Sequence, residues 1–374
     1  MRRKNAQSHD NAIEMCLKKS LLKSPPASPG VAEVGEPVVS AIVICRNEEA
    51  YIDKCLEGIC AQSGMSDRLE IIVVDGMSTD GTRAIVNSWQ ARDSRVRLID
   101  NPRRIVPSGL NEGIRQARGE FIAVISAHAE YANDYFVQCQ RTVSETGADN
   151  VGGPAEARGQ GYVQQTVALA FNSPYSSGGA RWHDLEYAGY VDTTATGFYR
   201  RSRLLEIGLY DEELVRNQDD ELNLRLIRSG GKIYQNPKIR YVYYPRESLG
   251  KLFGQYLQYG YWKVRVIQKH RVPASVRHLV PALALLLAIT LATAGFLVEK
   301  AWIALAALGT VYVLGTFAAT VQICLKRGVW RPAPLLPVVL ACCHLGYGLG
   351  FMMGFIDFVL LRRGGRRAFA VLTR

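Results

Sequence analysis

The chain has 374 residues, enough for one large or two modest domains, and its net charge at pH 7 is +11. The basic excess lies in residues 263–374, which hold 14 Lys and Arg against 2 Asp and Glu, whereas residues 1–262 hold 31 basic and 32 acidic residues. The basic third is also the most apolar part of the sequence. Basic residues beside long apolar runs are typical of a membrane surface, so we expect membrane lipid, and no nucleic acid, as a partner.

The eight cysteines and the first 36 residues carry no recognisable site motif. No Cys-x-x-Cys pair and no Cys/His spacing suited to zinc occurs, so we expect reduced, mostly buried thiols. Residues 1–36 mix charge, Ser and Pro without an apolar run long enough for a secretory signal, which predicts a flexible leader.

From residue 38 onward, short β-branched runs alternate with stretches of helical periodicity, and repeated strand–helix units predict an α/β fold with a mostly parallel sheet. The predicted strands are residues 38–44, 69–75, 96–100 and 121–126. The predicted helices are residues 47–62, 79–89 and 107–119. Residues 150–245 are less regular, with a helix from 219 and late strands at 232–234 and 238–243.

The last third begins with an amphipathic stretch, residues 249–269, in which aromatic side chains precede basic ones. This order is typical of an interfacial helix, and the alternative is a soluble helix packed on the core. Three apolar stretches follow at 279–298, 301–325 and 333–361, each long enough for a transmembrane helix of roughly 20 residues.

The positive-inside rule places the basic segments before the first stretch, between the second and third, and after the third in the cytoplasm. Three full spans cannot satisfy this rule, because the tail would end outside. The third stretch holds Gly346, Gly348, Gly350 and Gly354, so a re-entrant or broken helix is an alternative, and two to four spans stay open. The predicted parts are a leader at 1–36, a catalytic domain at 37–247, an interfacial helix and basic linker at 248–278, a membrane domain at 279–362 and a basic tail at 363–374.

Polar clusters follow the first two predicted strands: ICRNEE at 44–49 and VVDGMSTDGT at 73–82. The carboxyl ends of parallel strands form the edge at which such folds bind ligands. There, the Asp75 carboxylate could accept hydrogen bonds from a uracil imide or ribose hydroxyls. The structural alternative is an Asp–Gly turn followed by a helix cap.

These two motifs, SAHAEY at 126–131 and NQDDELNLRLIRSGG at 217–231 occur in the order seen in family 2 glycosyltransferases. Over residues 38–245 the chain resembles the exopolysaccharide branch, similar to the succinoglycan-biosynthesis glucosyltransferases. The resemblance implies a GT-A fold and transfer of a sugar, here glucose from a UDP-sugar, with inversion. By position, Asp75 resembles the residue that binds the nucleobase of the donor. The resemblance places further donor-binding residues at Cys45, Asn47, Glu49, Gly76, Ser126, Arg181 and Arg201.

The family usually has Asp-x-Asp at the end of the fourth strand, and the similar branch has Asp-x-His. This chain has Ser126-Ala127-His128, followed by Glu130. A divalent cation would stabilise the charge of the leaving diphosphate, and a histidine ligand favours Mn²⁺ over Mg²⁺. We therefore expect a metal site at His128 and Glu130, with a satisfied loop histidine as the alternative.

Residues 217–222 resemble the family's Glu-Asp-x-Glu-Leu box, in which the Asp is the general base. The alignment places the base at Asp219, with Asp220 the candidate if the register is off by one. Adjacent acids raise one another's proton affinity, which suits a base. The structural alternative is an acidic first turn that matches the helix dipole.

Family position suggests an acceptor side formed by Gly197 and Trp182, where an indole could stack on a sugar. Arg181, Arg200 or Arg201 could meet a diphosphate, and solvated arginines are the alternative. The expected reaction adds one sugar to a polyprenyl-diphosphate-linked saccharide at the inner membrane, alongside other polysaccharide-assembly membrane proteins. A processive synthase is an alternative, although its usual Gln-x-x-Arg-Trp motif is missing from residues 255–262. A degenerate sugar-nucleotide-binding scaffold is another, motivated by Ser126.

Overall fold

The computed structural model describes residues 38–176, 178–273, 275–366 and 369. The predicted leader and the end of the basic tail lie outside these residues. Four parallel strands open the described chain and confirm the predicted ones to within two residues: β1 (Val39–Cys45), β2 (Leu69–Asp75), β3 (Val96–Asp100) and β4 (Phe121–Ser126). The helices between them are α2 (Ile52–Cys60), α3 (Thr82–Arg92) and α4 (Val106–Gln116).

Helices α2 and α3 begin five and three residues later than the sequence predicts. Residues 46–51 and 76–81, which precede these helices, form two loops. Hydrogen bonds between side chains and backbone amides join the first loop to the second. Asn, Ser, Thr and Asp side chains compete with the helix for backbone groups in this way. The delayed starts therefore keep two polar loops at the carboxyl edge of the sheet.

The second half of the domain turns the sheet from parallel to mixed. The main sheet has the order β3-β2-β1-β4-β9-β6-β10-β8, and a smaller sheet has the order β5-β11-β7. Strand β9 runs antiparallel to both β4 and β6. The later strands are β5 (Ala129–Tyr131), β6 (Asn150–Gly152), β7 (Ala155–Ala157), β8 (Gly189–Tyr190), β9 (Phe198–Arg200), β10 (Ile233–Gln235) and β11 (Tyr241–Tyr243). The later helices are α5 (Tyr135–Thr146), α6 (Gly161–Phe171), η1 (Arg181–His183), α7 (Arg201–Ile207) and α8 (Gln218–Arg228).

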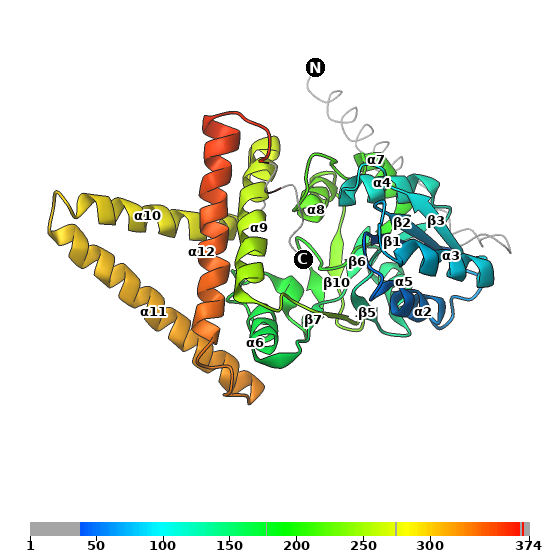
Figure 1. Ribbon diagram of the computed structural model, residues 1–374, viewed down its shortest axis with the longest axis horizontal. Helices are drawn as coiled ribbons and strands as arrows, with labels where there is room; N and C mark the ends of the chain where they lie inside the picture. Colours follow the sequence, from blue (N-terminus) through cyan, green and yellow to red (C-terminus); the bar gives the residue numbers. More distant parts are fainter. Residues whose placement is uncertain (1–37, 177, 274, 367–368, 370–374) are drawn as a thin grey trace, which may run out of the picture. The chain divides into compact units, whose positions relative to one another are not determined.

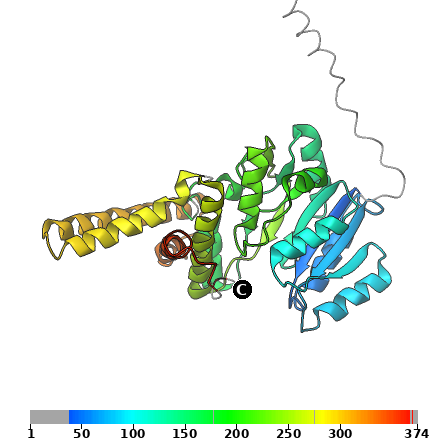
Figure 2. The same cartoon turned by 90° about the horizontal axis from the view of Figure 1, so that it is seen from above.

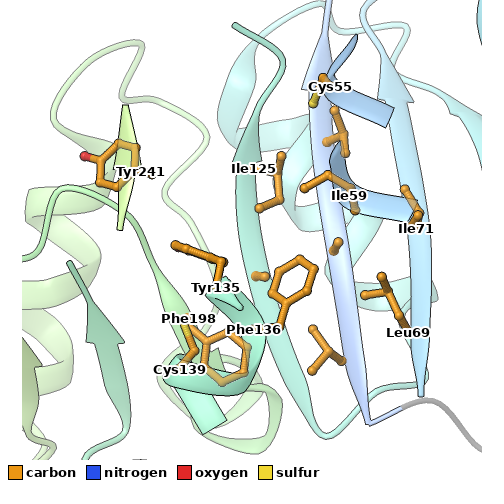
Figure 3. Packing of buried hydrophobic residues seen from close by; sticks show 14 of the residues in the cluster. Cys55, Ile59, Leu69, Ile71, Ile125, Tyr135, Phe136, Cys139, Phe198 and Tyr241 are labelled. Carbon is orange, nitrogen blue, oxygen red and sulfur yellow. The ribbon is translucent and has the colours of Figure 1, made fainter. Parts of the chain in front are cut away.

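The main core lies between one face of this sheet and helices α2 and α5. Ile59 of α2, Phe136 of α5 and Phe198 of β9 are at most 1% exposed and belong to one cluster with Ile71 and Ile125 of the strands (Figure 3). Burial of such apolar side chains is the main driving force for folding. The core therefore fixes the strands whose carboxyl ends carry the polar loops.

The last third is helical. Its elements are α9 (Leu249–His270), η2 (Val276–His278), α10 (Val280–Ala294), α11 (Lys300–Arg327), α12 (Leu336–Gly354) and the π-helical turn η3 (Phe355–Leu360). Three helical segments in the described part of the chain are long and apolar enough to cross a membrane: 276–294, 300–327 and 336–360. Helices α10 and α11 form a hairpin, whereas α12 lies beside α9 (Figures 1 and 2).

Glycines on α12 let it pack against the backbone of α9. A Cβ at Gly350 would lie 2.0 Å from the Leu257 carbonyl oxygen, and one at Gly354 would lie 2.5 Å from that of Tyr261. Small residues every four positions permit this close approach of two helices. The third apolar stretch is thus one continuous helical segment without a break, and its glycines serve packing.

Two aromatic residues of α9, Tyr261 and Trp262, are 0% and 3% exposed. The Tyr261 hydroxyl donates to Asp357 Oδ2 (2.9 Å), and the Trp262 indole donates to the Phe369 carbonyl (3.0 Å). Both rings therefore pack inside the protein and do not serve as anchors in the lipid headgroups.

Candidate active site

The loops that follow β1 and β2 are hydrogen-bonded to each other. Asn47 Oδ1 accepts from the Thr79 amide (2.9 Å), and Glu49 Oε2 accepts from the Gly81 amide (3.0 Å). Asn47 has a positive φ of 55°, a conformation that Asn tolerates better than most residues. Asn47 and Glu49, both expected beside the nucleotide, thus hold the loop that would border it.

Asp75 ends β2 directly beside Cys45 of β1, and both side chains are buried. Asp75 Oδ2 pairs with Arg83 Nη1 (2.6 Å) and accepts from the Ser78 amide (3.0 Å). The carboxylate predicted to hold the base therefore has protein partners on the side of its own loop, and its role toward a nucleotide stays a prediction.

Cys45 and Gly76 contribute to this edge through their backbones. The Cys45 carbonyl accepts from the Gly76 amide (2.8 Å), which ties the two strand ends together. Burial, and next the charge of Asp75, raise the pKa of the Cys45 thiol well above its ordinary value, so the thiol stays protonated. A Cβ at Gly76 would lie 3.2 Å from Cβ of Arg46, so a larger residue would press on the first loop.

His128 lies beside acidic and hydroxyl groups just beyond the end of β4. Ser126 is in register with Ile44 of β1, so it lies at the same edge as Cys45. The Ser126 hydroxyl is 3.3 Å from His128 Nε2, and His128 Nδ1 is 3.8 Å from Glu48 Oε1. Glu48 is 4% exposed, and sequence reasoning missed it although it belongs to ICRNEE.

Glu130 is engaged elsewhere. Its Oε1 pairs with Lys54 Nζ (2.5 Å) and accepts from the Tyr244 hydroxyl (3.2 Å). Among the described residues there is no group of three or more His, Cys, Asp and Glu side chains that could hold a metal ion. Glu130 therefore has a salt-bridge partner of its own, and its part in a metal site stays a prediction, whereas Glu48 is a carboxylate 3.8 Å from the histidine.

Helix α8 carries Asp219 in its first turn. Asn223, one turn later on the same face, accepts from Asn150 Nδ2 (3.1 Å) and donates to Thr193 Oγ1 (2.9 Å). Residues 193–197 lead into β9, where the Gly197 carbonyl accepts from the amide of Val124 in β4 (2.9 Å). This face of α8 therefore packs against the start of β6 and the segment that leads into β9.

Asp219 keeps access to solvent although protein surrounds it. Desolvation by the surrounding protein, and next the charge of Asp220, raise the pKa of Asp219 to about 6. A carboxylate with a pKa close to neutral is suited to take a proton from an alcohol. Asn217 positions this turn: it has a φ of 59° and donates to the Tyr259 carbonyl of α9 (2.9 Å).

The neighbouring Asp220 has a different environment. Its Oδ2 is 2.5 Å from Lys263 Nζ of α9, and Lys263 is only 4% exposed. Burial alone would raise the pKa of Asp220, but the Lys263 charge overrides it and lowers the pKa. The chain thus provides one acid that stays ionised and one that titrates. No sequence pattern pointed to Lys263, since its partner lies 43 residues away.

Three of the other residues predicted to line the donor or acceptor side lie in two segments: Arg181 and Trp182 in η1, and Gly197 directly before β9. Arg181 stacks over the ring of Tyr187 (4.9 Å), and Trp182 packs edge-on against Phe171 (5.1 Å). Gly197 is buried at the carboxyl end of β4, beside the ring of Tyr199.

Arg201 does not reach the candidate site. Its amide donates to the Glu120 carbonyl and its Nε to the Ile114 carbonyl (3.4 Å), both at the amino end of β4. Because β9 is antiparallel to β4, Phe121 faces Arg200, about 17 Å along the strand from Ser126. The expectation that Arg201 meets the donor is therefore wrong, and the charges of Arg200 and Arg201 serve the opposite edge.

A mixed α/β sheet that gathers polar strand ends beside a carboxylate of raised pKa is the architecture of GT-A glycosyltransferases. Residues 40–208 match the family described as Glycosyl transferase family 2, and the chain belongs to this family. It is 32% identical over 332 residues to the succinoglycan biosynthesis protein ExoA of Rhizobium meliloti (strain 1021), which covers 85% of this chain and 96% of that protein.

A second relative is the dolichyl N-acetyl-alpha-D-glucosaminyl phosphate 3-beta-D-2,3-diacetamido-2,3-dideoxy-beta-D-glucuronosyltransferase of Methanococcus voltae. It is 28% identical over 85% of this chain and 97% of that protein. Among solved structures, the mannosyltransferase PcManGT from Pyrobaculum calidifontis, in complex with GDP-Man and Mn²⁺, has a TM-score of 0.55 at 19% identity. It covers 91% of this chain and 95% of that one. This likeness confirms the fold, and the chain is a family 2 glycosyltransferase of glycan biosynthesis.

Proposed function

We propose that the protein transfers one sugar, with glucose as the first candidate, from a UDP-sugar to a lipid-diphosphate-linked saccharide, with inversion. The acceptor hydroxyl attacks the anomeric carbon while the nucleoside diphosphate leaves from the opposite face. Asp219 takes the hydroxyl proton. The relatives support a nucleotide-sugar donor and a glycan product: one belongs to succinoglycan biosynthesis, and the structural neighbour is in complex with GDP-Man.

One observation carries the proposal of a lipid-linked acceptor: the turn of α8 that carries the general base is held by α9, the helix that leads to the membrane segments. Asp220 is clamped by Lys263 of α9, and Asn217 is held by the backbone of the same helix. Helix α9 in turn packs along α12, one of the long apolar helices. An acceptor anchored in lipid beside these helices would present its hydroxyl to Asp219 without leaving the membrane surface.

We further propose that a divalent cation, with Mn²⁺ preferred, binds together with the donor. The donor set fits an ion shared with the substrate, because His128 Nδ1 and Glu48 Oε1 are 3.8 Å apart and imidazole and carboxylate both suit Mn²⁺. Phosphate oxygens of the donor would complete the coordination. When bound, the ion neutralises charge on the leaving diphosphate. Basic residues Arg271 and Arg277 just before α10 support a cytoplasmic catalytic domain at the inner membrane.

The test is transfer by the full-length protein in lipid nanodiscs. Radiolabelled UDP-sugars are offered with a polyprenyl-diphosphate-linked monosaccharide, with and without Mn²⁺, and the product's anomeric configuration is determined. We expect a single addition with an inverted anomeric centre. Transfer to a water-soluble sugar alone would contradict the lipid acceptor, and a ladder of products would favour a processive synthase. An active Asp219→Asn variant beside an inactive Asp220→Asn variant would move the base by one residue.

A further inference from the structure

Both ends of α12 lie against the catalytic domain. Near its start, Val339 and Leu340 share a buried cluster with Val167 of α6, and His344 Nε2 is 2.8 Å from the Tyr175 carbonyl oxygen. At its far end, Phe358 of η3 shares a cluster with Leu214, the loop residue that precedes α8. A helix that crosses the bilayer would separate its ends by a hydrocarbon core of about 30 Å.

Helix α9, which α12 accompanies, is itself fixed along the catalytic domain. Its first turn contributes Leu252 to the cluster with α6. Its last turns pair Arg265 and Lys269 with Glu213 (2.6 and 2.7 Å). Its 22 residues extend about 33 Å. If α12 crossed the membrane, this row of charged side chains and the domain behind it would have to cross with it, at a prohibitive desolvation cost.

The α10–α11 hairpin behaves differently. Arg277 pairs with Asp192 just before α10 (2.5 Å), and Arg327 at the end of α11 donates to the Asn172 carbonyl (3.5 Å). The start of α10 and the end of α11, opposite the turn of the hairpin, therefore both contact the catalytic domain. Its turn is highly exposed, with Phe296 at 81% and Leu297 at 90%, and it projects away from that domain in both views (Figures 1 and 2).

The exposed surface of α12 is a single apolar stripe. Val338, Leu345 and Leu349 of α12 and Ile356 of η3 are all exposed, and the spacing of 7 and 4 residues brings the first three to one face of a helix with 3.6 residues per turn. The residues of the opposite face are buried against α9 and α6.

We propose that only α10 and α11 cross the bilayer, and that α12 lies lengthwise in the leaflet next to the catalytic domain with its stripe in the acyl chains. The tail then returns to the side of the catalytic domain. This arrangement places all three basic segments on one side, as the positive-inside rule requires and as three full spans cannot do. Those segments contain Arg271 and Arg277, then Lys326, Arg327 and Arg331, and finally Arg362, Arg363 and Arg366.

The first experiment maps which side each segment faces in bacterial cells. Fluorescent-protein and exported-phosphatase reporters are fused after residue 374 of the full chain. Separately, Glu299→Cys in the hairpin turn is treated in spheroplasts with a membrane-impermeant maleimide, with the unsubstituted chain as control. We expect a fluorescent, phosphatase-negative C-terminus and a labelled residue 299. A phosphatase-positive C-terminus, or a residue 299 labelled only after lysis, would overturn the proposal.

The second experiment measures depth along α12. Nitroxide labels are attached singly at 338, 345, 349 and 356 through a ketone-bearing unnatural amino acid, so that the native cysteines stay unchanged, and oxygen and nickel accessibilities are compared in nanodiscs. Positions 338 and 356 are about 27 Å apart along the helix. We expect similar, shallow depths at all four positions. A profile that is deepest at 345 and 349 and shallow at both ends would show that α12 spans the bilayer.

Discussion

The acid at the end of β2 and the acids at the start of α8 lie in different environments. Asp75 is fully buried and paired with Arg83, a residue of its own strand–loop–helix unit. Asp219 is solvent-accessible, and its neighbour Asp220 pairs with Lys263. A carboxylate that is paired with an arginine stabilises a loop, whereas one with a raised pKa can exchange protons. The comparison teaches that proton transfer is best served where burial and a neighbouring acid raise the pKa of a carboxylate.

The largest effect is expected for Asp219→Asn, which tests the acid assigned to chemistry. Removing a general base should lower transfer by about 10²- to 10⁴-fold, because the acceptor hydroxyl keeps its proton. Turnover with the lipid-linked acceptor and UDP affinity by calorimetry are measured, and donor affinity should be unchanged. The isosteric Asp220→Asn variant is the control, and a loss of transfer confined to that variant would contradict the assignment.

His128→Ala tests the proposed metal site and should lower activity by at least about 10- to 100-fold, the loss typical when groups supporting a metal are removed. Activity is titrated with Mn²⁺ and Mg²⁺, and His128→Asp should restore turnover with a preference moved toward Mg²⁺. Glu130→Gln is the matched control. This substitution removes the charge that pairs with the exposed Lys54, so the transfer activity should stay close to that of the wild type. Equal losses in His128→Ala and Glu130→Gln would refute the placement of the metal.

Asp75→Asn tests the structural acid. Loss of a charged partner of Arg83 should destabilise the fold by about 2 kcal/mol, seen as a lower midpoint of thermal unfolding. Asp100→Asn is the control, because Asp100 pairs with the same guanidinium (2.8 Å) at a half-exposed site and should cost much less. If Asp75 also binds the uracil of UDP, the affinity for UDP falls in Asp75→Asn and not in Asp100→Asn. Wild-type stability of Asp75→Asn would remove the contrast drawn above.

The smallest effect is a shift in pH dependence. Transfer should fall as the pH drops through about 6, because Asp219 must be ionised to accept a proton and its pKa is about 6. Lys263→Met removes a positive charge that lowers this pKa, so the acid limb of kcat/KM should move to higher pH. Lys263→Arg keeps the charge and serves as control. An acid limb that does not move in Lys263→Met would show that α9 does not tune the base.

The local sequence patterns were sufficient to predict the four parallel strands at the start of the catalytic domain. Alternating β-branched and amphipathic runs predicted β1 to β4 because buried parallel strands have a composition that depends little on distant residues. The same patterns predicted strand ends at Ile44, Asp75 and Ser126; the structure confirms the last two and ends β1 one residue later, at Cys45. The order of the motifs was enough to assign the family.

Only the folded chain decided where the remaining side chains lie. The antiparallel β9 carries Arg201 to the far edge of the sheet, and β5 turns Glu130 toward Lys54. The partners of Lys263 and of the α12 glycines come from segments 43 or more residues away. An apolar run has the same composition whether it faces lipid or protein. The contacts of α12, and not its amino-acid sequence, therefore distinguish it from the α10–α11 hairpin that precedes it.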